Sequence, residues 1–390
     1  MGQERIDDAV VVGGGIIGCA IAREAARAGL RVRLLEKSAI GGEASGAAAG
    51  LLSPQAEADR MDPLFQLCLA SRDLFPDFAR QVAEESGLDP ALSERGTLVV
   101  ARRGAEAEEL DRRVSFQRSL GLAAERLGGE ALRRMEPALH PDWSEGLYLP
   151  RDWTVDNAIL VRGLGIAAAR LGARLLSGAR AERLMVENGR VVGVESGGER
   201  VRAGAVVVAA GAWSAEIAGP GVAPLPSHPV RGQIVCFGPS PVPAYPLFTH
   251  RCYLVPRRDG RVLAGSTMER SGFDKSVTGS GLAGLSASAL ALIPALGDAP
   301  FHSAWAGLRP ATPDERPAIG RVRTPGLLYA CGHLRNGILL APLTARVVTR
   351  LLVDEDPGMD LSPFDPSHFP GVDGAAGAPG ESTVSGPAGP

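Results

Sequence analysis

The sequence predicts an α/β fold in which a doubly wound, Rossmann-like domain is combined with a second, α+β domain. Three observations support this prediction. A strand, a glycine-rich turn, a helix and another strand follow one another within residues 9–36. A further strand–turn–helix unit lies at 327–352. Between residues 224 and 301, proline and glycine separate short alternating segments, which is typical of an antiparallel sheet.

The N-terminal unit has the layout that holds a dinucleotide. The strand 9–12 enters Gly13-Gly14-Gly15-Ile16-Ile17-Gly18, a helix follows over 19–28, and the strand 31–35 ends at Glu36. In this motif the first glycine permits a tight turn, the second lets backbone approach the pyrophosphate, and the third lets the helix pack closely. The helix N-terminus favours phosphate, and the acid accepts ribose hydroxyls. Because a chain with 50 glycines forms such triplets by chance, the flanking strand, helix and acid carry the interpretation.

The C-terminal unit indicates which dinucleotide binds. The strand 327–331 breaks at Gly332-His333-Leu334-Arg335-Asn336-Gly337 and continues as a helix over 338–352. A simple NAD-dependent dehydrogenase has no obvious use for this second turn. A flavoprotein does, because its long cofactor lies across the domain. We therefore expect FAD.

Composition excludes several other classes of protein. A net charge of −3 does not indicate a nucleic-acid or anionic-membrane partner. No run of about 20 apolar residues predicts a membrane span, and acidic residues precede the apolar run 9–22, unlike a signal peptide. We expect a cytoplasmic protein. Five scattered cysteines without a CxxC pair, and six scattered histidines, indicate neither a disulfide framework nor a metal site.

The remaining pattern predicts how the two domains alternate along the chain. Helices are expected over 63–86, 105–120 and 156–171, the last capped by Asp156, with a strand over 96–100. A three-stranded meander is expected over 180–208. We assign 1–90, 151–222 and 305–370 to the FAD-binding domain. We assign 91–150 and 223–304 to the substrate domain, and we expect 371–390 to be a disordered tail.

Several motifs beyond the glycine turn resemble the D-amino-acid oxidase and glycine oxidase family of flavoenzymes over about residues 8–368. They include Ser45-Gly46-Ala47-Ala48-Ala49-Gly50-Leu51-Leu52, Cys252-Tyr253-Leu254-Val255-Pro256-Arg257, Gly265-Ser266-Thr267-Met268, Trp305-Ala306-Gly307-Leu308-Arg309-Pro310 and the GHLRNGILLAP run from Gly332. They resemble glycine oxidases more than sarcosine oxidases. Residues 311–320 contain no cysteine, and Cys331 precedes the turn, so the resemblance implies non-covalent FAD.

The resemblance implies roles for four residues at the substrate. Arg309 is expected to hold a carboxylate bidentately, which an amino-acid oxidase requires in a dry pocket. Tyr253 is expected to donate to the same carboxylate, and Arg335, one of 39 arginines in the chain, to add positive field. Met268 is expected in the pocket wall. The alternatives are a core tyrosine for Tyr253 and simple gap filling for Met268.

The cofactor is expected to contact residues from both strand–turn–helix units, the alanine-rich segment and the end of the meander. These residues are Gly13, Gly15, Ile16, Ile17, Gly18, Glu36, Lys37, Ser45, Ala47, Ala48, Ala49, Gly50, Leu51, Ala181, Ala210, Gly211, Trp213, Gly307, His333, Arg335, Asn336, Gly337, Ile338 and Leu339. Amides of 337–339 are expected to stabilise negative charge at N1 and C2=O of the flavin. For His333, satisfying neighbouring groups is favoured over a general-base role.

The expected reaction is oxidation of glycine, and also of sarcosine and small D-amino acids, by hydride transfer to flavin N5. O₂ is then reduced to H₂O₂, and the imine hydrolyses to glyoxylate and ammonia or supplies thiamine thiazole synthesis. The alternatives are a D-amino-acid or sarcosine oxidase of the same family, a dehydrogenase that uses another electron acceptor, and a non-catalytic flavin-binding protein. The resemblance also implies a homo-oligomer, specifically a tetramer.

Overall fold

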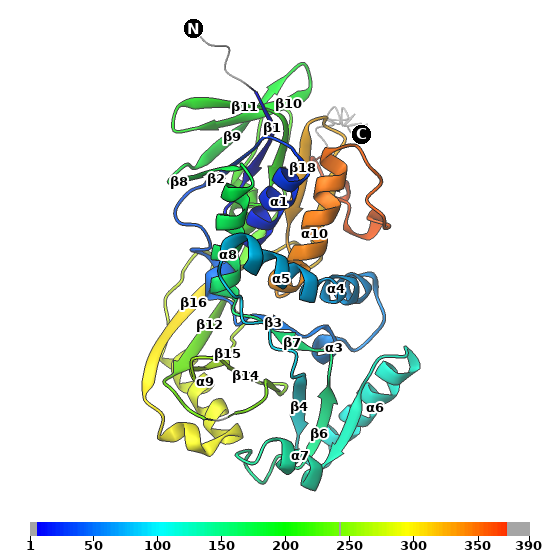
Figure 1. Ribbon diagram of the computed structural model, residues 1–390, viewed down its shortest axis with the longest axis vertical. Coiled ribbons are helices and arrows are strands. Elements are labelled where there is room, and N and C mark those ends of the chain that lie inside the picture. The colour runs from blue at the N-terminus through cyan, green and yellow to red at the C-terminus, as the bar shows by residue number, and fades with distance from the viewer. Residues whose placement is uncertain (1–5, 242, 373–390) are drawn as a thin grey trace, which may run out of the picture.

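The computed structural model describes residues 6–241 and 243–372, and two sheets organise them (Figure 1). The first sheet contains five parallel strands in the order β18-β11-β1-β2-β8, and antiparallel strands extend it. β17 pairs with β18, and β9 and β10 extend β11. Its strands are β1 (Asp7–Val12), β2 (Val32–Glu36), β8 (Arg174–Ser177), β9 (Ala181–Glu187), β10 (Arg190–Ser196), β11 (Glu199–Val208), β17 (Ala318–Arg321) and β18 (Leu327–Cys331).

Helices cover one face of this sheet, with α1 packed against both α8 and α10. Alternate strand residues explain why both faces are buried: Val11 and Leu34 face the helices, whereas Val10 and Leu35 belong to the cluster beneath β9 and β10. The helices here are α1 (Ile16–Arg27), α4 (Pro63–Asp73), α5 (Phe75–Ser86), α8 (Asn157–Arg170) and α10 (Gly337–Leu352).

The second sheet is antiparallel apart from the β13–β4 pair, which confirms the predicted mixed, largely antiparallel architecture. It lies in the lower half of Figure 1 in the order β16-β12-β15-β14-β13-β4-β6-β5. Its strands are β4 (Thr97–Ala101), β5 (Glu125–Gly128), β6 (Glu145–Leu149), β12 (His228–Phe237), β13 (Leu247–Phe248), β14 (Tyr253–Pro256), β15 (Val262–Gly265) and β16 (Phe301–Ala311). The helices α6 (Ala105–Ser119), α7 (Gly129–Met135) and α9 (Gly279–Leu292) accompany it.

Short elements connect the two layers. The strands β3 (Leu51–Leu52) and β7 (Trp153–Thr154) form a two-stranded sheet of their own. The helices α2 (Ala44–Ala47) and α3 (Pro54–Glu57) flank β3, and the 3₁₀ helix η1 (Gly211–Glu216) follows β11. The remaining 3₁₀ helices are η2 (Pro294–Gly297), η3 (Ser362–Phe364) and η4 (Pro366–His368).

The chain passes between the sheets close to the predicted domain boundaries. One strand differs: β16 belongs entirely to the second sheet and ends at Ala311, beyond the boundary predicted at 304. Its ten-residue partner β12 explains the difference, because the two strands pair along their whole length from Phe301 onward. The division into folding domains stays a prediction.

Two local expectations differ from the structure. The helix predicted over 63–86 is two helices, α4 and α5, that meet at Leu74. Pro76 explains the break, because a proline has no N–H to donate to the preceding turn. The disordered tail predicted over 371–390 does not hold for Val372, which is fully buried in the cluster beneath β9 and β10. The rest of that tail, 373–390, lies outside the described residues.

Other predicted elements are confirmed. The three-stranded meander is β9–β10–β11, and the carboxylate of Asp156 caps α8 by accepting from the Ile159 N–H at 3.0 Å. In the described part of the chain, no helix is both long and apolar enough to cross a bilayer.

We predict that Gly18→Ala lowers the melting temperature, because the added Cβ meets the Gly13 carbonyl oxygen at 1.9 Å. Overpacking of this kind costs about 1–3 kcal/mol. Thermal unfolding followed by circular dichroism measures the effect. The control is Gly284→Ala in α9, where a Cβ meets nothing within 4 Å and alanine favours the helix. Equal melting temperatures for the two variants would contradict the close packing of α1.

Candidate active site

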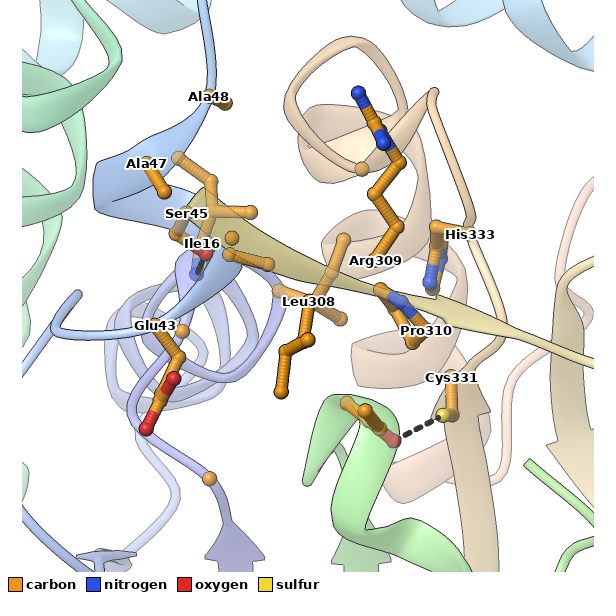
Figure 2. A pocket seen from close by; sticks show the side chains of 18 of the residues that line it. Ile16, Glu43, Ser45, Ala47, Ala48, Leu308, Arg309, Pro310, Cys331 and His333 are labelled. Atoms are coloured by element: carbon orange, nitrogen blue, oxygen red, sulfur yellow. Dashed lines mark hydrogen bonds between the residues drawn. The ribbon is translucent and has the colours of Figure 1, made fainter. Parts of the chain in front are cut away.

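A cavity lies where the carboxyl ends of the parallel strands meet the second sheet. Both sheets contribute to its lining, and Figure 2 shows part of it, with Ala47 and Ser45 on one side and Arg309 and His333 on the other. Ligands of open α/β sheets bind at this edge. The structure brings 24 of the sequence-predicted site residues to this lining: Gly13, Gly15, Ile16, Ile17, Glu36, Lys37, Ser45, Ala47, Ala48, Ala49, Gly50, Leu51, Ala181, Ala210, Gly211, Trp213, Tyr253, Gly307, Arg309, His333, Arg335, Asn336, Gly337 and Ile338.

Three predicted site residues do not line the cavity. Gly18 packs against the Gly13 carbonyl, which brings α1 close to the sheet, and Leu339 is buried in the core between the first sheet and its helices. Met268 is half exposed, at 50 %, so the structure does not place it in the pocket wall. It follows the cavity-lining Ser266 by two residues, on a segment that leaves the cavity.

One end of the cavity has the features of a dinucleotide-diphosphate site. A Cβ on Gly13 would lie 2.4 Å from the Ala209 carbonyl oxygen, so only glycine fits between the two strands. The first turn of α1 leaves backbone N–H groups without helical acceptors and directed to the cavity. One of these groups, the Ile16 N–H, donates to the hydroxyl of Ser45 at 2.8 Å. This end can hold two phosphates without a basic side chain.

Glu36 is fixed at the tip of β2 for a ribose. Its two carboxylate oxygens accept from the Gly14 N–H at 2.7 Å and the Ser38 N–H at 2.8 Å. A carboxylate oxygen has a second lone pair, and Glu36 lines the cavity, so it can still accept ribose hydroxyls. A 2′-phosphate at the same place would meet a negative charge.

The other end of the cavity leaves space for a flat ring against backbone. A Cβ on Gly307 would lie 2.7 Å from the Ala47 Cβ, so β16 and α2 approach closely. The Trp305 indole N–H donates to the Ala47 carbonyl at 2.9 Å and fixes this approach. Opposite them, α10 begins at Gly337 with no side-chain cap, which leaves its first amides available to an electronegative ring edge.

Arg309 lies in this part of the cavity without a carboxylate partner among the described residues. Its Nη2 donates to the Ser266 hydroxyl at 2.6 Å and its Nη1 to the Thr267 carbonyl at 3.1 Å. Burial lowers its pKa from the ordinary value, but a guanidinium still keeps its charge at neutral pH. A partly buried cation that is held by neutral acceptors is a site for an anion.

Glycines make room for the groups around Arg309. A Cβ on Gly232, on the neighbouring strand β12, would lie 2.0 Å from Nη1 of Arg309. A Cβ on Gly265 would lie 2.5 Å from the hydroxyl oxygen of Tyr253. Burial raises the pKa of Tyr253, and the nearby charge of Arg309 opposes this, so the hydroxyl is protonated at neutral pH. The Tyr253 hydroxyl and Arg309 can therefore both donate to one carboxylate.

Two polar residues that sequence reasoning missed also line this region. The first, Ser266, stands in the Gly265–Met268 motif, two residues before Met268. The second, Glu57, forms an ion pair with Arg335 at 3.4 Å, so Arg335 already has a counterion, whereas Arg309 has none among the described residues. In the sequence, only the proximity of Glu57 to the Ser45–Leu52 motif indicates that this residue lines the cavity.

A buried junction fixes the helix that carries Glu57. The carboxylate of Asp152 is fully buried and accepts from the backbone N–H of Gln55 at 3.3 Å and of Ala56 at 2.7 Å, at the start of α3. The Nη1 of Arg72, also buried, lies 3.8 Å from it. Burial raises the pKa of Asp152 to about 7. This junction determines where Glu57 enters the cavity.

His333 and Cys331, at the second turn, are both neutral. His333 is 3 % exposed, its Nε2 lies 3.1 Å from the Thr344 hydroxyl, and burial lowers its pKa to about 3. Cys331 donates to the Gly211 carbonyl at 3.1 Å, and burial raises its pKa to about 11. His333 therefore contacts a neighbouring hydroxyl, and its role beside the cofactor stays a prediction. Among the residues described, no group of three His, Cys, Asp or Glu side chains is arranged to hold a metal ion.

Comparison with known proteins agrees with this geometry. The family model described as "FAD dependent oxidoreductase" matches residues 8–351. A glycine oxidase from Geobacillus kaustophilus is 37 % identical over 92 % of this chain and 96 % of its own length. The crystal structure of glycine oxidase from that organism superposes with a TM-score of 0.88, at 36 % identity, covering 93 % of this chain and 99 % of the other. A bifunctional ThiO/ThiG protein from Trichormus variabilis is 36 % identical over 93 % of this chain, which spans only 55 % of it.

The chain belongs to the family of FAD-dependent oxidoreductases. The cavity fits this cofactor, because the Gly13 turn and the start of α1 suit a diphosphate, Glu36 suits a ribose, and the Gly307–Ala47 approach suits a ring. The residues that would hold FAD thus come from both strand–turn–helix units and from α2.

We predict that Gly232→Ala raises KM for the amino-acid substrate at least tenfold, because its Cβ displaces the Arg309 guanidinium. A tenfold change corresponds to about 1.4 kcal/mol of lost binding. Steady-state kinetics measure the change. Gly128→Ala is the matched control, since a Cβ there meets nothing within 4 Å. An unchanged KM in Gly232→Ala would show that the position of Arg309 does not determine substrate affinity.

Proposed function

We propose that this protein is an FAD-dependent glycine oxidase that also oxidises sarcosine and small D-amino acids. The observation that carries the proposal is Arg309, a partly buried guanidinium beside the flavin end of the cavity without a carboxylate partner among the described residues. Its only hydrogen-bond partners there are neutral oxygens, so an amino-acid carboxylate would supply the missing negative charge. The names of the relatives support glycine as the amino acid.

The residues of the chain would bind and align the substrate. Arg309 and the Tyr253 hydroxyl would hold its carboxylate, which directs the α-carbon toward the ring site between Gly307 and the start of α10. Alignment of this kind supplies much of the acceleration. FAD, when bound, provides the hydride acceptor at N5 and the route for two electrons to O₂, which yields H₂O₂.

No protein base is required for this reaction. His333 is neutral and its Nε2 already faces Thr344, so it is not directed at a substrate proton. The substrate would react as the neutral amine, and the resulting imine would leave to hydrolyse to glyoxylate and ammonia. The first amides of α10 would stabilise negative charge that develops on the adjacent ring edge.

The imine also suggests a place for the reaction in metabolism. Bifunctional ThiO/ThiG proteins are similar to this chain over about half of their length, so in those proteins the oxidase-like part is joined to a second part. We propose that the glycine imine formed here supplies thiamine thiazole synthesis. The cytoplasmic location and the tetramer remain predictions.

Peroxide release from the purified protein tests this function. Glycine, sarcosine, D-alanine and D-proline are compared, and we expect glycine to be a substrate. Slow reoxidation of the reduced protein by air would favour the dehydrogenase alternative. If glycine fails to bleach the yellow colour in the absence of oxygen, the protein is a flavin binder that does not oxidise glycine.

We predict that Arg309→Ala raises KM for glycine by about 10-fold to 150-fold while FAD stays bound, which follows from the roughly 1.5–3 kcal/mol of a hydrogen bond to a charged group. Initial rates of peroxide release give KM, and the flavin absorbance gives occupancy. Arg80→Ala, at an exposed arginine on α5 paired with Glu84, serves as the control. A normal KM in Arg309→Ala would mean that another group holds the carboxylate.

A further inference from the structure

The segment 266–278, between β15 and α9, extends from the second sheet to the rim of the cofactor cavity. Its base is fixed to β12, because the backbones of Arg231 and Glu269 exchange two hydrogen bonds of 2.9 Å. The Arg231 guanidinium is buried and pairs with the carboxylates of Glu269 and, at 2.7 Å, of Asp274. The segment is therefore held in a defined conformation.

The far part of the segment contacts two residues that line the cavity on the side of the first sheet. The ring of Phe273 lies 5.2 Å from that of Trp213, between centroids. The Nζ of Lys275 lies 3.0 Å from Oε2 of Glu43. Neither Phe273 nor Lys275 lines the cavity, so both act on it through their partners.

A second lysine, Lys37 directly after β2, contacts the same two partners. The Nζ of Lys37 lies 3.4 Å from Oε1 of Glu43 and 3.0 Å from the centroid of the Trp213 ring. Lys37 and Lys275 are the only lysines in the sequence, which has 41 basic residues. Both lysines pair with the same carboxylate, that of Glu43.

The position of Glu43 explains why its charge needs neutralising. Glu43 lines the cavity two residues before Ser45, whose hydroxyl accepts from the Ile16 N–H at the start of α1. This is the end of the cavity that fits the diphosphate. An unpaired carboxylate here would repel the two phosphate charges of FAD through a partly buried, weakly screened region.

We propose that the segment 266–278 is a strap by which the substrate domain retains FAD. Lys275 reduces the repulsion between Glu43 and the diphosphate, and Phe273 keeps Trp213 against the cavity. The strap crosses from one domain to the other, so FAD retention depends on their docking. The proposal rests on FAD binding by the family and not on glycine as the substrate.

Equilibrium dialysis of the holoenzyme against known FAD concentrations tests the strap. At low salt, Lys275→Met should raise the dissociation constant of FAD about fivefold to tenfold, the size expected for loss of one partly exposed ion pair beside an anion. The increase should shrink at high salt. The double variant Glu43→Gln/Lys275→Met should return to within about twofold of wild type, because the repelling charge is gone.

Arg258→Met is the matched control. It removes another exposed interdomain ion pair, Arg258–Asp89 at 2.6 Å, that lies outside the cavity lining, and it should leave FAD affinity unchanged. An unchanged dissociation constant in Lys275→Met would overturn the proposal. It would also be overturned if Arg258→Met weakened FAD equally, or if the double variant bound FAD as weakly as Lys275→Met. Glycine turnover by the wild-type protein is a separate measurement, so failure of the proposed function is distinguishable.

Discussion

The arrangement of the candidate active site depends on the positive charge of Arg309. The fold places this guanidinium at the junction of two sheets and gives it neutral acceptors from Ser266 and Thr267, but no carboxylate among the described residues. Desolvating a charge without a counterion costs free energy, and that cost is reduced when an anionic ligand binds. Glycine at position 232 keeps the space for the guanidinium open. The guanidinium therefore leaves a positive charge without a counterion among the described residues, at the position where an amino-acid carboxylate would lie.

A second constraint is the close approach of β16, in the second sheet, to α2 beside the ring site. Gly307 on β16 packs against Ala47, and the indole of Trp305 donates to the Ala47 carbonyl. These contacts place β16, the strand that carries Arg309, at a fixed distance from α2, which is expected to contact the flavin. Substrate binding and cofactor binding would therefore not be independent, since Gly307 and Arg309 of β16 both line the cavity. Catalysis by alignment requires this kind of rigidity.

The sequence predicted the strand–turn–helix units and most of the cavity lining, because glycine turns and helix starts are encoded locally. Pro76 was a local signal that was overlooked. The position of Met268 could not be read in this way, since it depends on how the segment after β15 leaves the sheet. Glu57 and Glu43 were missed for a similar reason: each has a partner, Arg335 and Lys275 respectively, that is more than 200 residues away along the chain. Only Lys37, the second partner of Glu43, lies near it in the sequence.

The most direct measurement of the central claim is a titration of the oxidised protein with acetate, a carboxylate that lacks an amine to oxidise. The account predicts that acetate changes the flavin absorbance of the wild-type protein saturably, and that Arg309→Met abolishes the change while it retains the flavin. Binding of acetate to Arg309→Met with wild-type affinity would show that this guanidinium is not the carboxylate site.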